Sequence, residues 1–75
     1  MEIDFFIEGL AKHVFTNTSE QQINKETSFM ELEDWNSMTA FSLISYIDES
    51  FGKKITLPEL LQSQTIEDLF LIVNS

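Results

Sequence analysis

The amino-acid sequence predicts a small all-α protein, a four-helix bundle of three main helices and one short helix with a long first connection. Three segments place apolar residues three and four positions apart, which puts them on one face of a helix. Capping or helix-breaking residues stand at the ends of these segments. Hydrophobic residues make up 43% of the 75 positions, too many for a disordered chain. A single folded domain over residues 1–75 is therefore expected.

The central segment, residues 34–52, carries the clearest helix signals. Asn36 or Ser37 can cap the free N–H groups at its start, and Gly52 follows Phe51 where a left-handed residue would end the helix. Its apolar residues form two stripes. The stripe expected to face the core consists of Leu43, Ile44, Ile47 and Phe51. The smaller stripe, expected to be at least partly exposed, consists of Met38 and Phe41.

Two further main helices are predicted, one at each end of the chain. The first spans Glu2 to about Phe15. Its apolar stripe comprises Ile3, Phe6, Ile7, Leu10 and Val14. The last begins at Thr65, and Asp68 three residues later completes a pattern similar to a capping box. Its apolar stripe comprises Ile66, Leu69, Phe70 and Val73.

The segments between the main helices are predicted to be connections. The long one, Glu20 to Trp35, is expected to pack across the bundle through its apolar residues, which are Ile23, Phe29, Met30 and Leu32. Ile55 and Leu57 alternate with polar residues, but no partner strand is visible, so we expect a loop with both side chains inward. A short helix from Pro58 to Gln62 should follow, because proline suits the first helical position. Two of its residues would face the core or a groove, Leu60 and Leu61.

The charge of the chain restricts its partners. Thirteen acidic residues stand against four lysines, which gives a formal net charge of −9. This balance argues against nucleic acid and anionic membranes as ligands and favours protein partners with basic surfaces. No segment is long and apolar enough for membrane insertion, and the acidic first residues do not resemble a signal peptide, so the cytoplasm is expected. With no cysteine and one histidine, no metal site is expected.

Four stretches together resemble the acyl carrier protein family over nearly the whole chain: Asp34–Met38, Ile47–Gly52, Lys54–Pro58 and Thr65–Leu69. The family's attachment motif, Asp-Ser-Leu, stands here as Asn36-Ser37-Met38 at the start of an amphipathic helix. The resemblance implies a four-helix bundle whose Ser37 carries phosphopantetheine, placed there from coenzyme A by a phosphopantetheinyl transferase. The arm's thiol would hold acyl groups as thioesters, and the protein itself would not be an enzyme.

The resemblance also implies that the helix from Ser37 meets the partners, namely the transferase and acyl-loading and acyl-processing enzymes with basic docking patches. The candidate partner-binding residues are Asn36, Met38, Phe41, Asp48 and Glu49. A monomer is expected. Asn36 replaces the family's aspartate, and Asp34 is expected to replace the missing charge in part. Thr39 and Ser42 stand where fatty-acid carriers usually have acids, so fatty-acid, polyketide, amino-acyl and other specialised pathways all stay open.

Two other functions compete with the carrier role. In a small hydrolase Ser37 would be the nucleophile, His13 the base, and Asp34 or Asp48 the orienting acid. The chain has no Gly-x-Ser-x-Gly elbow, and 75 residues leave little room for a substrate cleft.

The second competitor is a small acidic helical interaction module without a prosthetic group. It would dock Met38 and Phe41 in a groove of its partner. Ser37 would then only cap a helix, as serine commonly does.

Overall fold

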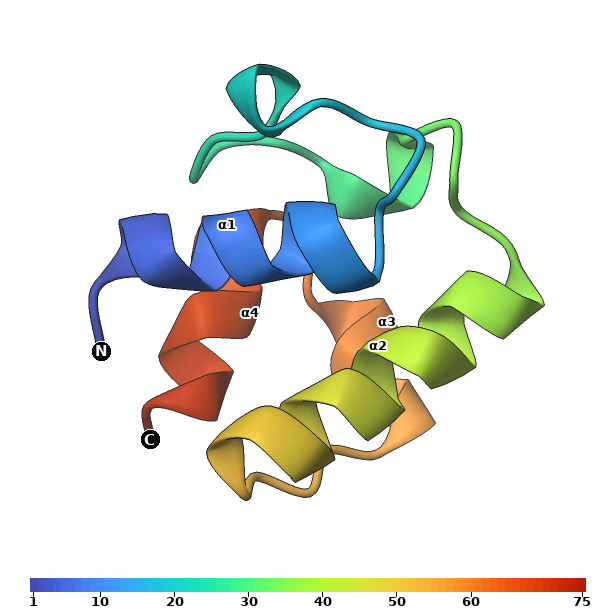
Figure 1. Cartoon of the computed structure of the whole chain (residues 1–75). Helices are drawn as coiled ribbons and strands as arrows, with labels where there is room; N and C mark the ends of the chain where they lie inside the picture. The colour runs from blue at the N-terminus through green and yellow to red at the C-terminus, as the bar shows by residue number, and fades with distance from the viewer.

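The computed structural model describes residues 1–75 and contains four α-helices and no β-strand (Figure 1). The helices are α1 (Ile3–His13), α2 (Ser37–Phe51), α3 (Leu57–Gln62) and α4 (Ile66–Val73). Two short 3₁₀ helices lie in the connection between α1 and α2, and they are η1 (Glu20–Gln22) and η2 (Phe29–Glu31). The predicted all-α bundle with one short helix and a long first connection is confirmed.

Local cap chemistry sets where α2 begins and ends. The side chain of Asn36 accepts a hydrogen bond from the backbone N–H of Thr39, at 2.9 Å, so Asn36 is the cap and Ser37 is the first helical residue. At the other end Gly52 adopts the left-handed conformation with φ of 67°, as the sequence predicted.

The short helix α3 and the last helix α4 both begin with a capping box. Thr65 and Asp68 form the one at α4, as predicted. At α3 the box is formed by Thr56 and Glu59, so the helix begins at Leu57, one residue before the predicted Pro58. The first helix ends at His13, about two residues before the predicted Phe15.

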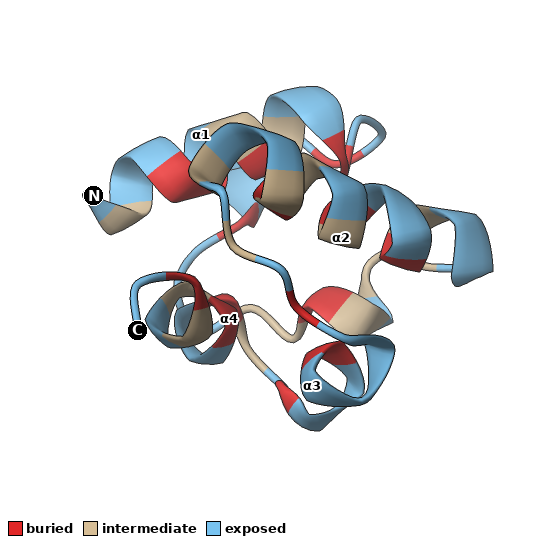
Figure 2. Cartoon of the chain, turned by 90° about the horizontal axis from the view of Figure 1, so that it is seen from below, coloured by how far each residue is buried: buried red, intermediate tan, exposed pale blue.

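One hydrophobic core holds the helices together. Figure 2 shows that every helix has both buried and exposed segments. The core contains residues of all four helices, of the first connection and of the loop between α2 and α3: Phe6, Ile7, Leu10, Val14, Phe15, Ile23, Phe29, Ala40, Leu43, Ile47, Ile55, Leu60, Ile66, Leu69 and Val73. Within the predicted core stripe of α2, Leu43 and Ile47 are fully buried, whereas Ile44 and Phe51 are half-buried and pack against the core.

The prediction for Leu57 was wrong. Its neighbour Ile55 is buried as expected, but Leu57 is 37% exposed. The alternation of inward and outward side chains expected from Ile55 onward does not reach Leu57, because Leu57 is the first residue of α3. On the same helix Leu60 joins the core and Leu61 is exposed.

The first connection arches over the bundle and runs on to α2 (cyan to green in Figure 1). Midway along it, residues 25 and 27 contact the start of α4. The backbone carbonyls of Thr27 and Lys25 accept hydrogen bonds from the N–H groups of Ile66 and Glu67, at 3.1 and 2.9 Å. These are two of the N–H groups that a helix start leaves without an internal partner. The first connection therefore packs against the start of α4 and supplies acceptors for two of its free N–H groups.

A close approach between α1 and α2 fixes their relative position. Gly9 of α1 faces Tyr46 of α2, and a Cβ at position 9 would overlap the tyrosine hydroxyl. The Tyr46 ring stacks on His13 with ring centroids 5.4 Å apart and meets Phe51 edge-on at 5.8 Å. The absence of a side chain at Gly9 therefore lets α2 lie close against α1.

Candidate functional site

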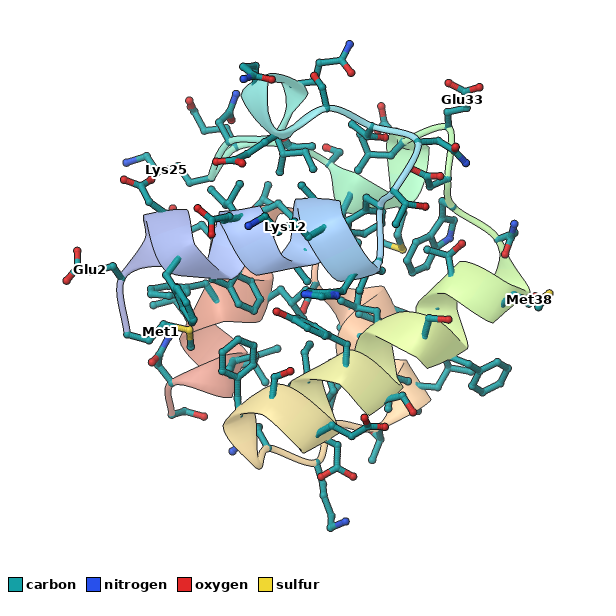
Figure 3. All side chains as sticks on the ribbon, in the orientation of Figure 1. Met1, Glu2, Lys12, Lys25, Glu33 and Met38 are labelled. Carbon is teal, nitrogen blue, oxygen red and sulfur yellow. The ribbon has the colours of Figure 1, made fainter.

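Ser37 is exposed at the free end of α2. Figure 3 shows that its neighbour Met38 points away from the body of the molecule at this end. The chain enters α2 through Asn36, whose φ of −164° is extended, so no preceding helical turn covers the Ser37 hydroxyl. The preceding Trp35 is anchored edge-on against Phe29, with ring centroids 5.6 Å apart.

Only some of the backbone N–H groups in the first turn of α2 have a hydrogen-bond acceptor within the protein. Asn36 accepts from Thr39 N–H through its side chain and from Ala40 N–H through its carbonyl, at 2.9 and 3.0 Å. The N–H groups of Ser37 and Met38 have no hydrogen-bond partner in the protein. No acidic residue lies in this turn. The positive end of the helix dipole is therefore uncovered at Ser37, where an anionic group would be stabilised.

The expectation that Asp34 supplies negative charge beside Ser37 does not fit its position. Asp34 is buried, and its carboxylate accepts hydrogen bonds from the Asn17 N–H at 3.1 Å and from the Thr18 hydroxyl at 2.9 Å. A buried carboxylate needs such donors, and the loop after α1 provides them. Asp34 instead joins this loop to the start of α2, since its carbonyl accepts the Thr39 hydroxyl.

The residues of a hydrolase site are not brought together. Asp48 lies eleven positions after Ser37, about 16 Å along the axis of α2. Its carboxylate accepts from Lys54 at 3.3 Å. His13 stacks on Tyr46, itself about 13 Å along the axis from Ser37. With Asp34 held by Thr18, no acid and base lie beside the serine.

An open groove of about 400 Å³ lies beside Ser37, between the start of α2 and α3. Its lining comprises Trp35, Asn36, Ser37, Ala40, Phe41, Leu57 and Leu61. No charged side chain is among them. The sequence predicted both stripes of α2 and left open whether Leu60 and Leu61 face the core or a groove. It did not place a groove beside Ser37, because a groove depends on how α3 packs against α2.

The candidate partner-binding residues occupy two ends of α2. Met38 and Phe41 are 79% and 62% exposed near Ser37, which confirms the prediction of an exposed apolar stripe. Glu49 is exposed and Asp48 half-buried in the last turns of the helix. The Asp48–Lys54 pair is exposed to solvent, where such pairs contribute little stability.

Comparison with protein families gives a match over residues 13–70 to the family described as phosphopantetheine attachment site. The matched region includes Ser37, the groove and the first turn of α4. The chain belongs to this family. Its members attach phosphopantetheine covalently to a serine, so this protein is a phosphopantetheine carrier protein, and the resemblance to acyl carrier proteins is confirmed.

Comparison with curated proteins and with solved structures found no match. No helix of the carrier protein has the length and apolar character needed to cross a membrane.

Proposed function

We propose that Ser37 is the serine that carries phosphopantetheine and that the protein presents acyl thioesters on this arm to partner enzymes. The observation that supports the proposal most is the exposed hydroxyl of Ser37 at the uncovered start of α2, inside the region that matches the family. The phosphodiester of the arm would be negatively charged and would lie beside the unpaired N–H groups of Ser37 and Met38.

The other serines of the matched region are less suited to attachment. Ser19 and Ser28 precede the short 3₁₀ helices, and Ser63 is 3% exposed with its hydroxyl donating to the Glu59 carbonyl. Three more are exposed on the body of α2, Ser42, Ser45 and Ser50. Their N–H groups lie beyond the first turn and already take part in the helix, so they offer a phosphate no free donors.

Attachment requires Ser37 Oγ to act as the nucleophile toward coenzyme A held by the transferase. A bond forms between Oγ and the phosphorus next to the pantetheine, and the diphosphate P–O bond breaks, releasing adenosine bisphosphate. The hydroxyl proton leaves to a base of the transferase. When attached, the arm supplies the thiol that this cysteine-free chain lacks.

The same end of the molecule is suited to docking enzymes. Met38 and Phe41 present apolar surface near Ser37, and Asn36 caps the start of the helix. Asp48 and Glu49 add negative charge near the other end of α2. Partners with basic docking patches would complement this surface. Their affinity should fall as ionic strength rises, and titrations with the transferase that give the same affinity at low and high salt would contradict docking by charge.

The pathway served by the carrier is proposed only as a class: fatty-acid, polyketide or a related specialised biosynthesis. The competing role, an acidic interaction module without a prosthetic group, differs in one observable respect. Such a module would receive no arm when given a transferase and coenzyme A.

The decisive experiment is intact-mass analysis after incubation with a phosphopantetheinyl transferase and coenzyme A. The wild-type protein should gain one phosphopantetheine, and Ser37→Ala should gain none while keeping its denaturation midpoint. The matched control is Ser42→Ala, which removes another exposed serine of α2 and should be modified normally. Modification of Ser37→Ala, or no modification of the wild type, would overturn the assignment.

A further inference from the structure

We propose that Asp34 is a positioning residue for the attachment reaction: its buried carboxylate holds the start of α2, so that the Ser37 hydroxyl stands at a fixed place when a transferase docks. This inference rests on the proposed attachment at Ser37. It assigns a role to a buried charge three positions before the serine that the attachment chemistry itself does not use.

The start of α2 has few buried contacts of its own. Within residues 37–42 only Ala40 is buried. Figure 1 shows this end of α2 at the edge of the molecule, far from α4. The close approach of α1 to α2 occurs at Tyr46, about 13 Å farther along the helix axis. A helix end with so little buried surface opens readily unless the chain that enters it is held.

The carboxylate of Asp34 ties this end to a firmly packed part of the protein. It accepts the Asn17 N–H at 3.1 Å and the Thr18 hydroxyl at 2.9 Å. Both donors lie in the loop after α1, where Phe15 is fully buried and its carbonyl accepts the Thr18 N–H at 3.1 Å. Separating the loop from Asp34 would leave a buried carboxylate without donors, which is costly. The loop therefore holds the segment that precedes α2.

The hold extends from Asp34 to both sides of Ser37. The carbonyl of Asp34 accepts the Thr39 hydroxyl, and the side chain of Asn36 accepts the Thr39 N–H at 2.9 Å. Both hydrogen bonds span Ser37, so the serine lies inside a short closed segment whose first residue is Asp34. The place of the Ser37 hydroxyl therefore depends on where the Asp34 backbone is held.

The attachment reaction is sensitive to this placement. The Ser37 oxygen must approach the phosphorus of coenzyme A closely and in line, and a misplacement of about 1 Å can cost a large factor in rate. The docking surface farther along α2 is held independently, because Leu43 and Ile47 are fully buried in the core. Loss of the Asp34 hydrogen bonds should therefore lower kcat for transfer more than it changes KM for the carrier protein.

The test is steady-state transfer from coenzyme A by one phosphopantetheinyl transferase, with the carrier protein as the varied substrate. Asp34→Ala should lower kcat about tenfold or more and change KM by less than about threefold. Thr18→Val removes a donor on the far side of the hydrogen bond and should also lower kcat. The double variant should be no slower than Asp34→Ala alone, because both substitutions remove the same interaction.

Two further variants separate the hydrogen bonds from charge and from stability. Asp34→Asn removes the charge but keeps an oxygen that can take the place of the one bonded to both Asn17 and Thr18, so its kcat should stay close to that of the wild type. Val73→Ala is the matched control for lost stability, since Val73 is buried on α4, away from the start of α2. Its kcat should equal that of the wild type under conditions where it is folded.

Hydrogen exchange gives a readout of the start of α2 itself. The amide protons of Thr39 and Ala40, which bond to Asn36, should exchange faster in Asp34→Ala and in Thr18→Val than in the wild type. Those of α4 should keep their protection. A general loss of stability would instead speed exchange in both helices.

Three outcomes would overturn the positioning role while leaving the attachment site intact. The first is a wild-type kcat in Thr18→Val, which decides alone if Asp34→Ala does not fold. The second is a loss in Val73→Ala as large as in Thr18→Val, since stability would then set the rate. The third is a loss in Asp34→Asn as large as in Asp34→Ala, since charge rather than hydrogen bonding would then matter. No mass increase in the wild type would instead contradict attachment at Ser37.

Discussion

The starts of α4 and α2 are built from similar cap residues but finished differently. At α4 the N–H groups of Ile66 and Glu67 bond to the first connection, and the Asp68 N–H bonds to the Thr65 hydroxyl. Glu67 and Asp68 also place negative charge in the first turn. At α2 a cap is present, but two N–H groups are unpaired and the first turn has no acid.

This difference separates a structural helix start from one that is available to another molecule. An acid near a helix N-terminus contributes about 0.3–1 kcal/mol, and α2 lacks that contribution while α4 has it twice. The residues around the two starts differ in the same way, since Ile66 is fully buried whereas Ser37 and Met38 are exposed. Substitutions in the closed body of the protein should therefore change mainly its stability. Substitutions at the open end of α2 should change mainly its function.

The largest contrast should appear between two residues of the same helix. Ile47 is fully buried, and Ile47→Ala should lower the free energy of unfolding by about 2–5 kcal/mol because it leaves a cavity. Phe41 is largely exposed in the groove wall, and Phe41→Ala should cost less than about 1 kcal/mol. Chemical denaturation gives both values.

Modification rates complete this comparison. Phe41→Ala should slow phosphopantetheine transfer, because Phe41 is proposed to contact the enzyme. Ile47→Ala should be modified at the wild-type rate under conditions where it is folded. If Phe41→Ala were as destabilising as Ile47→Ala, the two faces of α2 would not be separated as the structure indicates.

A smaller effect is expected where α1 and α2 approach each other in the closed body. Gly9→Ala would normally favour a helix, but its Cβ would overlap the Tyr46 hydroxyl and displace a ring packed on His13. We expect a net loss of about 1–3 kcal/mol. The double variant Gly9→Ala with Tyr46→Phe should recover most of it, since the nearest remaining atom is Cζ at 3.2 Å.

Denaturation of the two single variants and the double variant gives this coupling directly. A Gly9→Ala variant as stable as the wild type would show that Tyr46 moves aside at no cost, and the close approach would then not fix α2. Transfer to Ser37 should be unaffected in all three variants, because the open end of α2 lies about 13 Å from Tyr46 along the helix.

Local features of the fold were predictable from the sequence, and long-range ones were not. Gly52, Thr65 and the two stripes of α2 act through neighbours within a few positions, so their patterns are visible in the chain itself. Asp34 bonds to residues 16 and 17 positions earlier, and no pattern in the sequence indicates that pairing.

The candidate site divides in the same way. Its serine, cap and exposed stripe were found from residue type and spacing. A groove was one alternative for Leu60 and Leu61, but its position beside Ser37 was not predicted, because Leu57 was assigned inward and because a hollow depends on the packing of α3 against α2. The hydrogen bonds from the first connection to α4 were missed for the same reason, since they join Thr27 and Lys25 to residues about 40 positions away.

The smallest effects should come from single carboxylates, and substitutions at the starts of α4 and α2 should change stability in opposite directions. The N–H of Gln64, then that of Thr65 and the Thr65 hydroxyl, hold the pKa of Asp68 below its ordinary value. The backbone N–H and hydroxyl of Thr56, with a contribution from Lys53, lower the pKa of Glu59 at the start of α3. A carboxyl group whose pKa is lowered by folding stabilises the protein above its unfolded pKa, and this stabilisation is lost as pH falls through the folded pKa.

One substitution should remove the pH-dependent stabilisation at the start of α4, and another should introduce such a stabilisation at the start of α2. Asp68→Asn should lower stability at neutral pH, and the difference from wild type should shrink as pH falls through the lowered pKa of Asp68, because the group is then protonated in both folded and unfolded protein. Asn36→Asp should do the reverse, because a carboxylate would then accept from the Thr39 N–H at a helix start that now lacks an acid. Its added stability should be present at neutral pH and lost on acidification.

Denaturation at neutral and acidic pH measures both differences. An Asn36→Asp variant no more stable than wild type at neutral pH would show that the start of α2 is already satisfied, by solvent or by its own backbone, and the contrast with α4 would then lie in hydrogen bonding alone.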